Sequence, residues 1–467
     1  MSEKKQKNLW LVMLGPMIGA FVGMFSETSL NIALPQLSQS LHIGNATLQW
    51  LVTGYMLVIG IVLPLSSLLT KWFSTRKLIT FGLGCFLSGA IISACAPSFI
   101  PLLIGRLIQG IGTGIILPLM FTVAMSIFPP QKLGTAMGVC ALVIMFAPAI
   151  GPTLTGFILA KLSWHWIFWM FVPILLIALF FDLKYLVNIS EITKPKVDFI
   201  SIVESAVGFS LIVMGSSLAA EIGWLSPIVL GCLIGGAIIL FFYAKRQLKI
   251  DNPILNLRVF KKEAFSKGSF LVMLDFATIL AAMYILPQFI QRSMMIPVAL
   301  TGIIMLPGGI VNALVSAIAG KLYDNYGVKT IAIIGFIIAT IGAILLSLVS
   351  PKTSIAYVIM SHVILMIGCP LAMSPSQTHA LNSLDVTENA DGSTIINTLQ
   401  QIVGAISTAV ATSLLGLGAA SYHGHSTAAA FANGSHYGFY FTIILILIGL
   451  VVSLTLKKEP KSKDINL

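Results

Sequence analysis

Apolar residues run in long, nearly uninterrupted stretches along this chain. A window of about 19 residues, the length of helix that crosses ~30 Å of hydrocarbon, finds fourteen of them. They lie near 9–33, 48–70, 78–97, 101–126, 135–160, 164–187, 199–219, 225–244, 268–291, 298–319, 328–350, 353–375, 395–418 and 437–456. The first stretch, from Leu9, exceeds the ~7–15-residue apolar core of a signal peptide. The pattern predicts an all-α integral membrane protein with fourteen transmembrane helices and a retained first helix.

Composition supports a membrane protein. The 467 residues are 57% hydrophobic and only 9% charged, and the mean hydropathy is +0.97. Soluble domains carry roughly 25% charged residues, because their surface must face water. These charges are too few to cover such a surface, so a soluble fold is excluded and the lipid bilayer is the expected partner.

The basic residues orient the predicted helices. Of the 27 Lys and Arg residues, 23 lie in the two tails and in alternate loops, and the opposite loops hold only Lys161, Arg292 and Lys352. Cytoplasmic loops carry this excess, so both termini are predicted to be cytoplasmic. The net charge of +11 does not indicate nucleic acid, because no basic patch is interleaved with aromatic residues.

Cysteine and histidine give no sign of a metal or cofactor. The five cysteines fall inside predicted spans without metal-ligand spacing and are expected to pack as small apolar residues. They are Cys85, Cys95, Cys140, Cys232 and Cys369. His423, His425 and His436 are assigned to a solvated external loop. The chain has no Gly-rich nucleotide-binding loop followed by Lys-Ser/Thr, so ATP is not the expected energy source.

Charge also divides the chain. The stretch from Lys245 to Lys267 is the most charged segment and marks a boundary between helix bundles. The predicted domains are an N-terminal six-helix bundle (1–190), two inserted transmembrane helices with flanking cytoplasmic segments (191–250) and a C-terminal six-helix bundle (251–467). Residues 376–394, with three acidic and no basic residues, are expected to form a solvated cytoplasmic loop; a gating role is the alternative.

Two predicted cytoplasmic loops repeat one another, from Leu69 to Arg76 and from Leu322 to Lys329. Such repeats are typical of transporters built from related bundles. The second loop, with its preceding glycine, resembles the cytoplasmic loop signature of the major facilitator superfamily. The signature positions are Gly320, Asp324, Gly327 and Lys329.

Further stretches resemble the fourteen-helix drug:proton antiporter family, including lincomycin-resistance-type and quaternary-ammonium-type multidrug exporters of Gram-positive bacteria. Glu27 to Pro35 resembles the acidic signature of the first span, and Leu102 to Gly112 resembles the intramembrane arginine motif with Arg106, Gln109 and Gly110. The fifth span resembles the antiporter signature, whose small and bent positions suit a moving helix interface. Its residues are Gly138, Pro148, Gly151, Pro152 and Gly156.

The chain departs from the family pattern at three positions. Lys71 replaces the usual Asp of the first loop, Ser74 replaces its Gly, and Ala147 replaces a Gly of the fifth span. Gating at the first loop is therefore expected to differ, whereas Ala147 still allows close helix approach.

Glu27 and Asp275 are the acidic residues predicted to lie well inside apolar spans. A charge at mid-membrane costs about 2.5–3.5 kcal/mol, so such a group lines a wet cavity, pairs or takes up a proton. Both are interpreted as proton carriers or cation partners, against a structural hydrogen-bonding alternative. Arg106 is expected to tune their proton affinity or lock a conformation; direct binding of an anionic substrate is the alternative.

The expected substrate contacts are Glu27, Asn31, Tyr55, Asp275, Tyr284, Asn397 and Gln401. Asn397 and Gln401 lie one helical turn apart and so share a face. Each could instead pack against or hold together neighbouring helices.

The predicted function is a monomeric, proton-coupled antiporter that exports amphiphilic drug-like compounds across the plasma membrane of a Gram-positive bacterium by alternating access, as the resemblance implies. An exporter of an endogenous metabolite or lipid is the first alternative, and a non-transporting membrane sensor or scaffold is the second. An enzyme is not expected, because no nucleophile-base pair or set of metal ligands stands at useful spacing. No cofactor or metal is predicted.

Overall fold

The computed structural model describes residues 3–43, 45–48, 50–129, 132–186, 188–189, 192–193, 198–251 and 253–457. These residues fold mainly into helices. The α-helices are α1 Glu3–Leu41, α2 Asn45–Leu48, α3 Trp50–Trp72, α4 Thr75–Ala94, α5 Phe99–Ile127, α6 Leu133–Lys161, α7 His165–Trp169, α8 Phe171–Tyr185, α9 Phe199–Ile222, α10 Pro227–Lys249, α11 Glu263–Gln288, α12 Val298–Tyr326, α13 Val328–Ser347, α14 Ile355–Asn382, α15 Asn389–Ala420 and α16 Thr427–Leu454. Two 3₁₀ helices, Leu257–Lys261 and Val386–Glu388, and a π-helix, Phe289–Ser293, lie between them.

The helices account for the apolar stretches of the sequence. Within the described residues, thirteen helices are long and apolar enough to cross a membrane. One of these spans is formed by α7 and α8 together. The 29-residue α6 occupies the place of the remaining predicted span, and its apolar portion, Leu133–Pro148, is shorter. The chain is thus a multi-pass membrane protein.

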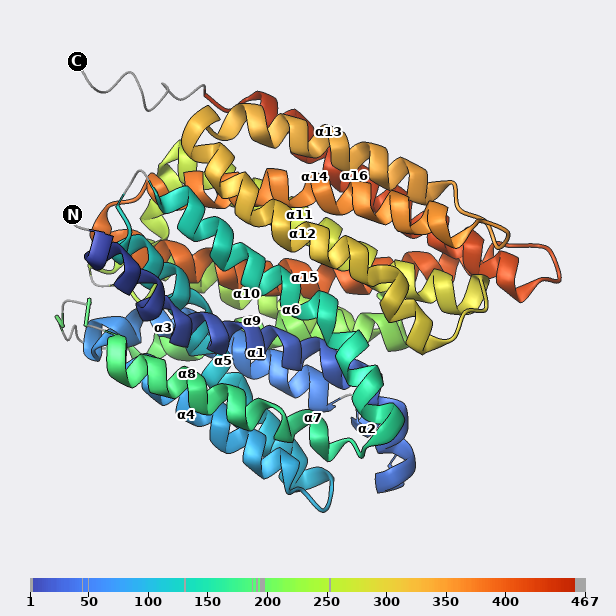
Figure 1. Ribbon diagram of the computed structural model, residues 1–467, viewed down its shortest axis with the longest axis horizontal. Coiled ribbons are helices and arrows are strands. Elements are labelled where there is room, and N and C mark those ends of the chain that lie inside the picture. The colour runs from blue at the N-terminus through green and yellow to red at the C-terminus, as the bar shows by residue number, and fades with distance from the viewer. Residues whose placement is uncertain are drawn as a thin grey trace.

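Both ends of the described chain lie at one end of the molecule (Figure 1). The Trp10 ring of α1 lies 4.9 Å from the Phe128 ring after α5. Near the last turn of α16, the Lys267 ammonium donates a hydrogen bond of 2.9 Å to the Thr455 carbonyl. Lys71 at the end of α3 belongs to the same end, which the positive-inside rule predicts to be cytoplasmic.

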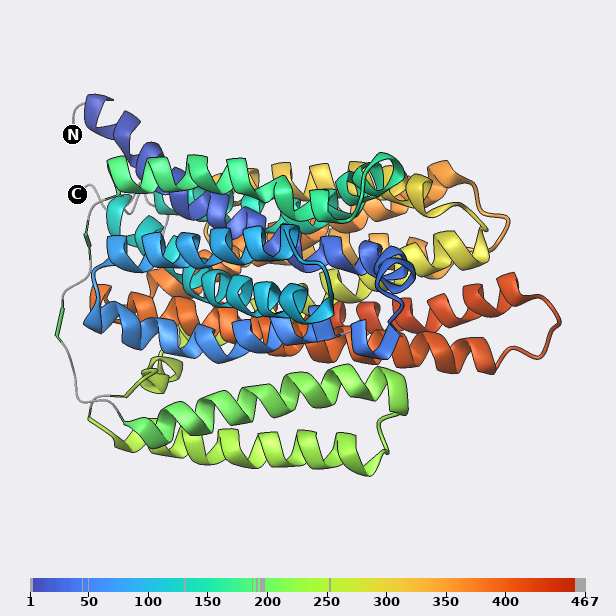
Figure 2. The ribbon, with the colours of Figure 1, turned by 90° about the horizontal axis from the view of Figure 1, so that it is seen from below.

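Helices α9 and α10 form a hairpin that lies beside the other helices (Figure 2). Ser217 of α9 and Thr53 of α3 have hydroxyls 3.2 Å apart. The Trp224 indole donates a hydrogen bond of 2.6 Å to Ser413 of α15. The hairpin therefore contacts helices from both ends of the sequence, α3 and α15. The domain boundaries at 190 and 250 stay a prediction.

An ion pair joins the start of α9 to the end of α10. Arg246 donates hydrogen bonds of 2.6 and 2.9 Å to the two oxygens of Asp198. These bonds lower the pKa of Asp198 to about 2, so this carboxylate remains charged throughout the physiological pH range.

The two halves share their glycine packing. A Cβ on Gly112 of α5 would lie 2.5 Å from the Gly82 carbonyl of α4. In the second half, a Cβ on Gly368 of α14 would lie 2.6 Å from the Gly335 carbonyl of α13. Both helix pairs therefore approach through glycine in the same way, which extends the internal repeat from the loops into the spans.

Two expectations for cysteine and histidine are wrong. Cys95 is exposed because it caps the end of α4, and Cys85 is only partly buried. His436 lies in α16 rather than in a loop. Helix α16 begins at Thr427, nine residues before His436. The His436 Nε2 lies 2.6 Å from the Val349 carbonyl. His423 and His425 are exposed, as expected for loop residues.

Candidate functional site

Arg106 lies fully buried on α5 and joins three helices. Its Nε donates to the Leu51 carbonyl at 3.2 Å, and one terminal nitrogen donates to Gln109 at 2.9 Å. The terminal nitrogens also donate to the hydroxyl and the carbonyl of Ser26 on α1. The guanidinium carbon lies 4.0 Å from the ring centre of Tyr55 on α3. Neutral acceptors and an aromatic face thus satisfy this cation, as an intramembrane arginine requires.

Glu27 follows Ser26 on α1 and is buried, with 9% of its surface exposed. Its Oε2 has no hydrogen-bond partner among the described residues. Arg106 belongs to the same cluster, but its nitrogens donate to other groups. Glu27 and Arg106, both described, therefore form no ion pair. A carboxylate held this way is poorly compensated, and protonation removes the cost.

Tyr55 is fixed at both ends of its side chain. Its hydroxyl donates to the Gly23 carbonyl at 2.9 Å and shares a hydrogen bond of 2.7 Å with Thr113. The ring is fully buried beneath Arg106. In this structure, Tyr55 positions the arginine; its predicted contact with a substrate stays a prediction.

Asp275 lies fully buried on α11. Among the described residues, neither carboxyl oxygen accepts a bond from an N–H or O–H donor. The hydrogen-bonding group that faces it is the Cys369 thiol of α14, a weak donor. Sequence reasoning assigned Cys369 to apolar packing; nothing in the spacing of the cysteines indicated this contact.

The other predicted substrate contacts are dispersed. The Asn397 amide donates to the Ser393 carbonyl of its own helix at 2.8 Å. Gln401, one turn further, and Tyr284 of α11 are partly exposed. The Asn31 side chain lies outside the described part of the structure. Glu27, Tyr55 and Arg106 therefore form one cluster, while Asp275 lies outside it and faces Cys369 of α14.

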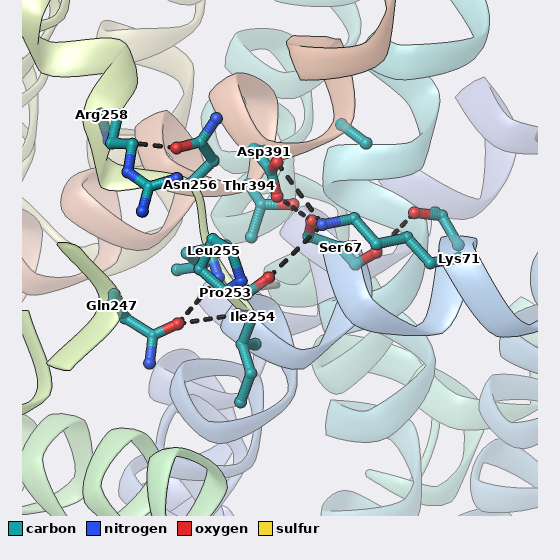
Figure 3. A network of polar contacts seen from close by, with 12 residues as sticks. Ser67, Lys71, Gln247, Pro253, Ile254, Leu255, Asn256, Arg258, Asp391 and Thr394 are labelled. Atoms are coloured by element: carbon teal, nitrogen blue, oxygen red, sulfur yellow. Dashed lines mark hydrogen bonds and ion pairs between the residues drawn. The ribbon is translucent and has the colours of Figure 1, made fainter. Parts of the chain in front are cut away.

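The end predicted to be cytoplasmic holds a second polar cluster, which we name the cytoplasmic clasp: Ser66, Ser67 and Lys71 of α3 with Asp391 and Thr394 of α15. Figure 3 shows Lys71 and Ser67 both pointing toward Asp391. The Lys71 ammonium lies 3.7 Å from Asp391. The Ser67 hydroxyl donates to the other carboxyl oxygen, and the Ser66 and Thr394 hydroxyls are 3.1 Å apart.

The expectation of a solvated loop over 376–394 is therefore wrong for much of that segment. Helix α14 continues to Asn382 and α15 begins at Asn389. The Asp391 side chain is only 4% exposed. A carboxylate in the first turn is stabilised by the helix dipole and here also by Lys71, which offsets its loss of water. The gating alternative stays a prediction for this segment.

A matching contact joins α12 and α6, the helices that correspond to α3 and α15 in the internal repeat. Asp324, at the end of α12, accepts hydrogen bonds of 3.1 and 3.2 Å from the backbone N–H groups of Gly134 and Thr135. Thr135 also donates its hydroxyl at 3.3 Å. Asp324 thus caps the N-terminus of α6 from another helix.

Comparison of the two contacts explains the departure at Lys71. Lys71 and Asp324 occupy equivalent positions of the repeated loop. Asp324 supplies a carboxylate to α6 from outside, whereas α15 carries its own carboxylate, Asp391, in its first turn. A second Asp at position 71 would repel Asp391, so the lysine preserves the attraction with the charges exchanged.

The segment after the α9–α10 hairpin is held against the clasp. Gln247 of α10 accepts a hydrogen bond of 2.7 Å from the Ile254 N–H and one of 3.4 Å from Leu255. The Lys71 ammonium donates to the Pro253 carbonyl at 3.5 Å (Figure 3). The segment that follows the hairpin therefore contacts the same lysine that pairs with Asp391 of α15. Sequence reasoning missed Gln247, because these residues lie far apart from Lys71 in the chain.

A second lysine binds the short segment before α15. Lys262 lies 2.6 Å from Glu388 and 3.0 Å from Asp385. The hydrogen bond to Glu388, followed by that to Asp385, raises the pKa of Lys262. Asp385 and Glu388 thus share one basic partner, Lys262, at the start of α11.

Glycines of the fifth-span signature differ in their surroundings. A Cβ on Gly138 would lie 2.7 Å from the Ser316 carbonyl of α12, and one on Gly151 would lie 2.5 Å from the Thr28 hydroxyl of α1. A Cβ on Gly156 would have no described neighbour within 4 Å, so its predicted packing role stays a prediction. Pro148 is buried in α6, and the Pro152 side chain lies outside the described set.

The remaining signature residues lie at helix contacts and ends. A Cβ on Gly110 would lie 3.0 Å from the Tyr55 carbonyl. Gly327 joins α12 to α13 with φ +72°, a conformation that favours glycine. Lys329 is partly exposed in the first turn of α13.

Gly320 gives a direct test of the α6–α12 contact. A Cβ on Gly320 would overlap the Gly134 carbonyl, so Gly320→Val should keep α12 from closing on α6. We expect transport to fall roughly tenfold or more, because bulky residues block close helix approach. Gly156→Ala is the matched control and should retain normal transport. Equal transport by both variants, measured at equal protein levels, would show that this contact is dispensable.

Comparison with known proteins places these features in context. Residues 17–408 match the family model described as Major Facilitator Superfamily. The chain is 44% identical over 466 residues to the lincomycin resistance protein LmrB of Bacillus subtilis, covering 97% of each chain. It is 43% identical over 449 residues to the LmrB protein of Listeria monocytogenes, covering 95% of each.

Among solved structures, the chain is similar to the human organic anion transporter MFSD10. The TM-score is 0.66 at 13% identity, with 95% of this chain and 100% of that chain covered. At this identity, the similarity concerns the fold alone.

Proposed function

Because this chain belongs to the Major Facilitator Superfamily, we propose that it is a proton-coupled antiporter that exports amphiphilic drug-like compounds across the plasma membrane. Protons would move inward as the compound moves outward. The membrane potential supplies about 2.3 kcal/mol per charge per 100 mV for such exchange, and the proposal includes no cofactor.

The observation that carries this proposal is the pair of buried carboxyl groups, Glu27 on α1 and Asp275 on α11. Neither forms an ion pair within the described residues, and both retain oxygens without a hydrogen-bond partner. Groups with this environment are stable when protonated and costly when ionised. Release of their protons would therefore require a change of surroundings, which couples proton binding to conformation.

The clasp supplies the conformational half of the mechanism. In the conformation described, Lys71 and Asp391 hold α3 and α15 together at the cytoplasmic end. Thr122 of α5 and Ser393 of α15 add a hydrogen bond of 2.9 Å. Protons would then reach the carboxyl groups from outside, and opening of the clasp would expose them to the cytoplasm.

Each cluster has a proposed task. Glu27 would respond to both proton and substrate, because Arg106 and Tyr55 adjoin it. Asp275, which has no cation beside it among the described residues, would act as a proton carrier. Asn31, Tyr284, Asn397 and Gln401 remain proposed substrate contacts. Two relatives are named lincomycin resistance proteins, so lincomycin is the first compound to test.

Uptake into everted membrane vesicles tests the proposal. An acidic vesicle interior should drive accumulation of lincomycin, and collapse of the pH gradient with nigericin should abolish it, because proton exit supplies the energy. Vesicles without the protein are the control. Accumulation that ignores the pH gradient would contradict proton coupling; gradient-driven uptake of a cellular lipid or metabolite in place of lincomycin would replace the substrate class.

A further inference from the structure

The second half contains a buried histidine that the proposed mechanism has not used. His362 lies on α14 at the same distance from Ser354, the residue that caps this helix, as Arg106 lies from Ser98 before α5. Only 3% of its surface is exposed, and its Nδ1 has no partner among the described residues. The imidazole is thus the counterpart of the intramembrane guanidinium.

The repeat also explains why the imidazole fits. Gly308 of α12 is equivalent to Tyr55 of α3, since each stands the same distance before the repeated loop. A Cβ on Gly308 would overlap the His362 ring. The imidazole therefore fills, from α14, space that a side chain of α12 would need.

Polar groups continue from His362 toward Asp275. Asn312 lies one turn after Gly308, and its amide donates to the Met366 sulfur at 3.3 Å, while its Oδ1 has no partner in the described structure. Met366 lies one turn after His362, and Cys369, less than one turn further, faces Asp275. At 1.5 Å per residue, His362 and Cys369 are about 10 Å apart along α14.

Helix α14 and the helices α11 and α12 beside it thus place buried polar atoms that have no N–H or O–H partner among the described residues along the face of α14 that carries His362, Met366 and Cys369. They are Nδ1 of His362, Oδ1 of Asn312 and both carboxyl oxygens of Asp275. Buried polar groups of this kind usually bind ordered water. This face runs inward from the start of α14, the end opposite to the cytoplasmic clasp.

We propose that His362 relays protons from the extracellular side to Asp275 through water held by Asn312. This inference rests on the proposed antiport. One ring nitrogen takes up a proton from external water, and the other nitrogen releases its proton along the water to a carboxylate oxygen of Asp275. The imidazole returns to its neutral form, so no charge stays on it.

The groups around the relay are consistent with this assignment. His362 forms no ion pair with a described residue of α6, α11, α12, α13 or α15, the helices against which α14 packs. Along this face of α14, the other titratable groups are Cys369 and Asp275. A neutral imidazole is the form that burial favours, and a neutral ring can accept and donate a proton at the same time.

Time-resolved infrared spectroscopy on the full protein in lipid nanodiscs tests the relay without a substrate. After a jump from alkaline to acidic pH, a carboxylic acid signal that Asp275→Asn removes should appear. His362→Ala should slow this signal roughly tenfold or more, since the relay is lost, without reducing its final size. External imidazole should restore the rate.

His362→Gln keeps a hydrogen-bonding side chain but cannot relay a proton. The carboxylic acid signal should therefore appear slowly in this variant, even where His362→Ala folds poorly. His425→Gln, in an exposed loop, is the control with an unchanged rate. Asn312→Leu should slow the signal as well. An unchanged rate in folded His362→Gln, or a loss of final signal without any change in rate, would overturn the relay. Normal gradient-driven vesicle uptake alongside that result would leave the proposed antiport standing.

Discussion

Replacement of Asp275 by Asn should lower pH-gradient-driven transport roughly a hundredfold while leaving substrate binding within about threefold of the original, because the amide keeps the shape but cannot carry a proton. Asp275 is fully buried and forms no ion pair with a described residue. The Asp275→Asn variant should therefore lose transport while it still binds the substrate. The measurement compares vesicle uptake with equilibrium binding of the same compound.

Asp182→Asn is the matched control for this prediction. Asp182 is also buried, on α8, but the Thr80 hydroxyl bonds to it outside the proposed proton path. We expect this variant to transport normally if it folds. Normal transport by Asp275→Asn, or equal loss in both variants, would remove Asp275 from the coupling mechanism.

Replacement of Lys71 by Met should open the cytoplasmic clasp. Asp391 would then remain buried without its cation, which costs about 1–3 kcal/mol after allowance for the partly exposed lysine. This cost shifts a two-state equilibrium by roughly 5- to 150-fold. Lys71→Met/Asp391→Asn removes both charges and should return the equilibrium to within about threefold of the original, because no buried charge is left unpaired.

Disulfide formation measures this shift. In a cysteine-free background, Ser66→Cys and Thr394→Cys should cross-link rapidly, since the native hydroxyls are 3.1 Å apart. Lys71→Met should slow cross-linking, and Lys77→Met, at an exposed lysine of α4, should leave it unchanged. If the single and double variants cross-link at the same rate, the Lys71–Asp391 pair does not hold the clasp closed.

Much of the fold could be predicted because the bilayer imposes a simple rule on the sequence. Long apolar stretches had to be helices, and thirteen described helices meet the criterion for crossing a membrane. The positions of Lys and Arg oriented them. Segment 376–394 was misinterpreted because acidic residues usually mark solvated loops; the burial of Asp391 depends on Lys71, more than 300 residues away.

The candidate site was only partly accessible from sequence. Glu27, Arg106 and Asp275 could be identified because charge is rare within membrane spans. Their partners could not: the contacts of Arg106 are mostly backbone carbonyls, a hydroxyl and an aromatic face. Cys369 and His362 carried no motif. Their positions acquire meaning only when the two halves are compared in space.

The inserted α9–α10 hairpin also gains a role from the structure. Hydropathy identified two extra spans but gave them no task. Gln247 fixes the segment that reaches Lys71, so the hairpin is connected to the clasp and not merely placed beside the other helices. This contact links an otherwise peripheral pair of helices to the proposed conformational change.

Proton flux in proteoliposomes tests the central claim most directly. Purified protein would be reconstituted with an imposed pH gradient, and proton movement would be recorded on addition of lincomycin. We predict proton flux that depends on the compound in the original protein and its loss in the Glu27→Gln/Asp275→Asn variant. Unchanged flux in this double variant would contradict the account.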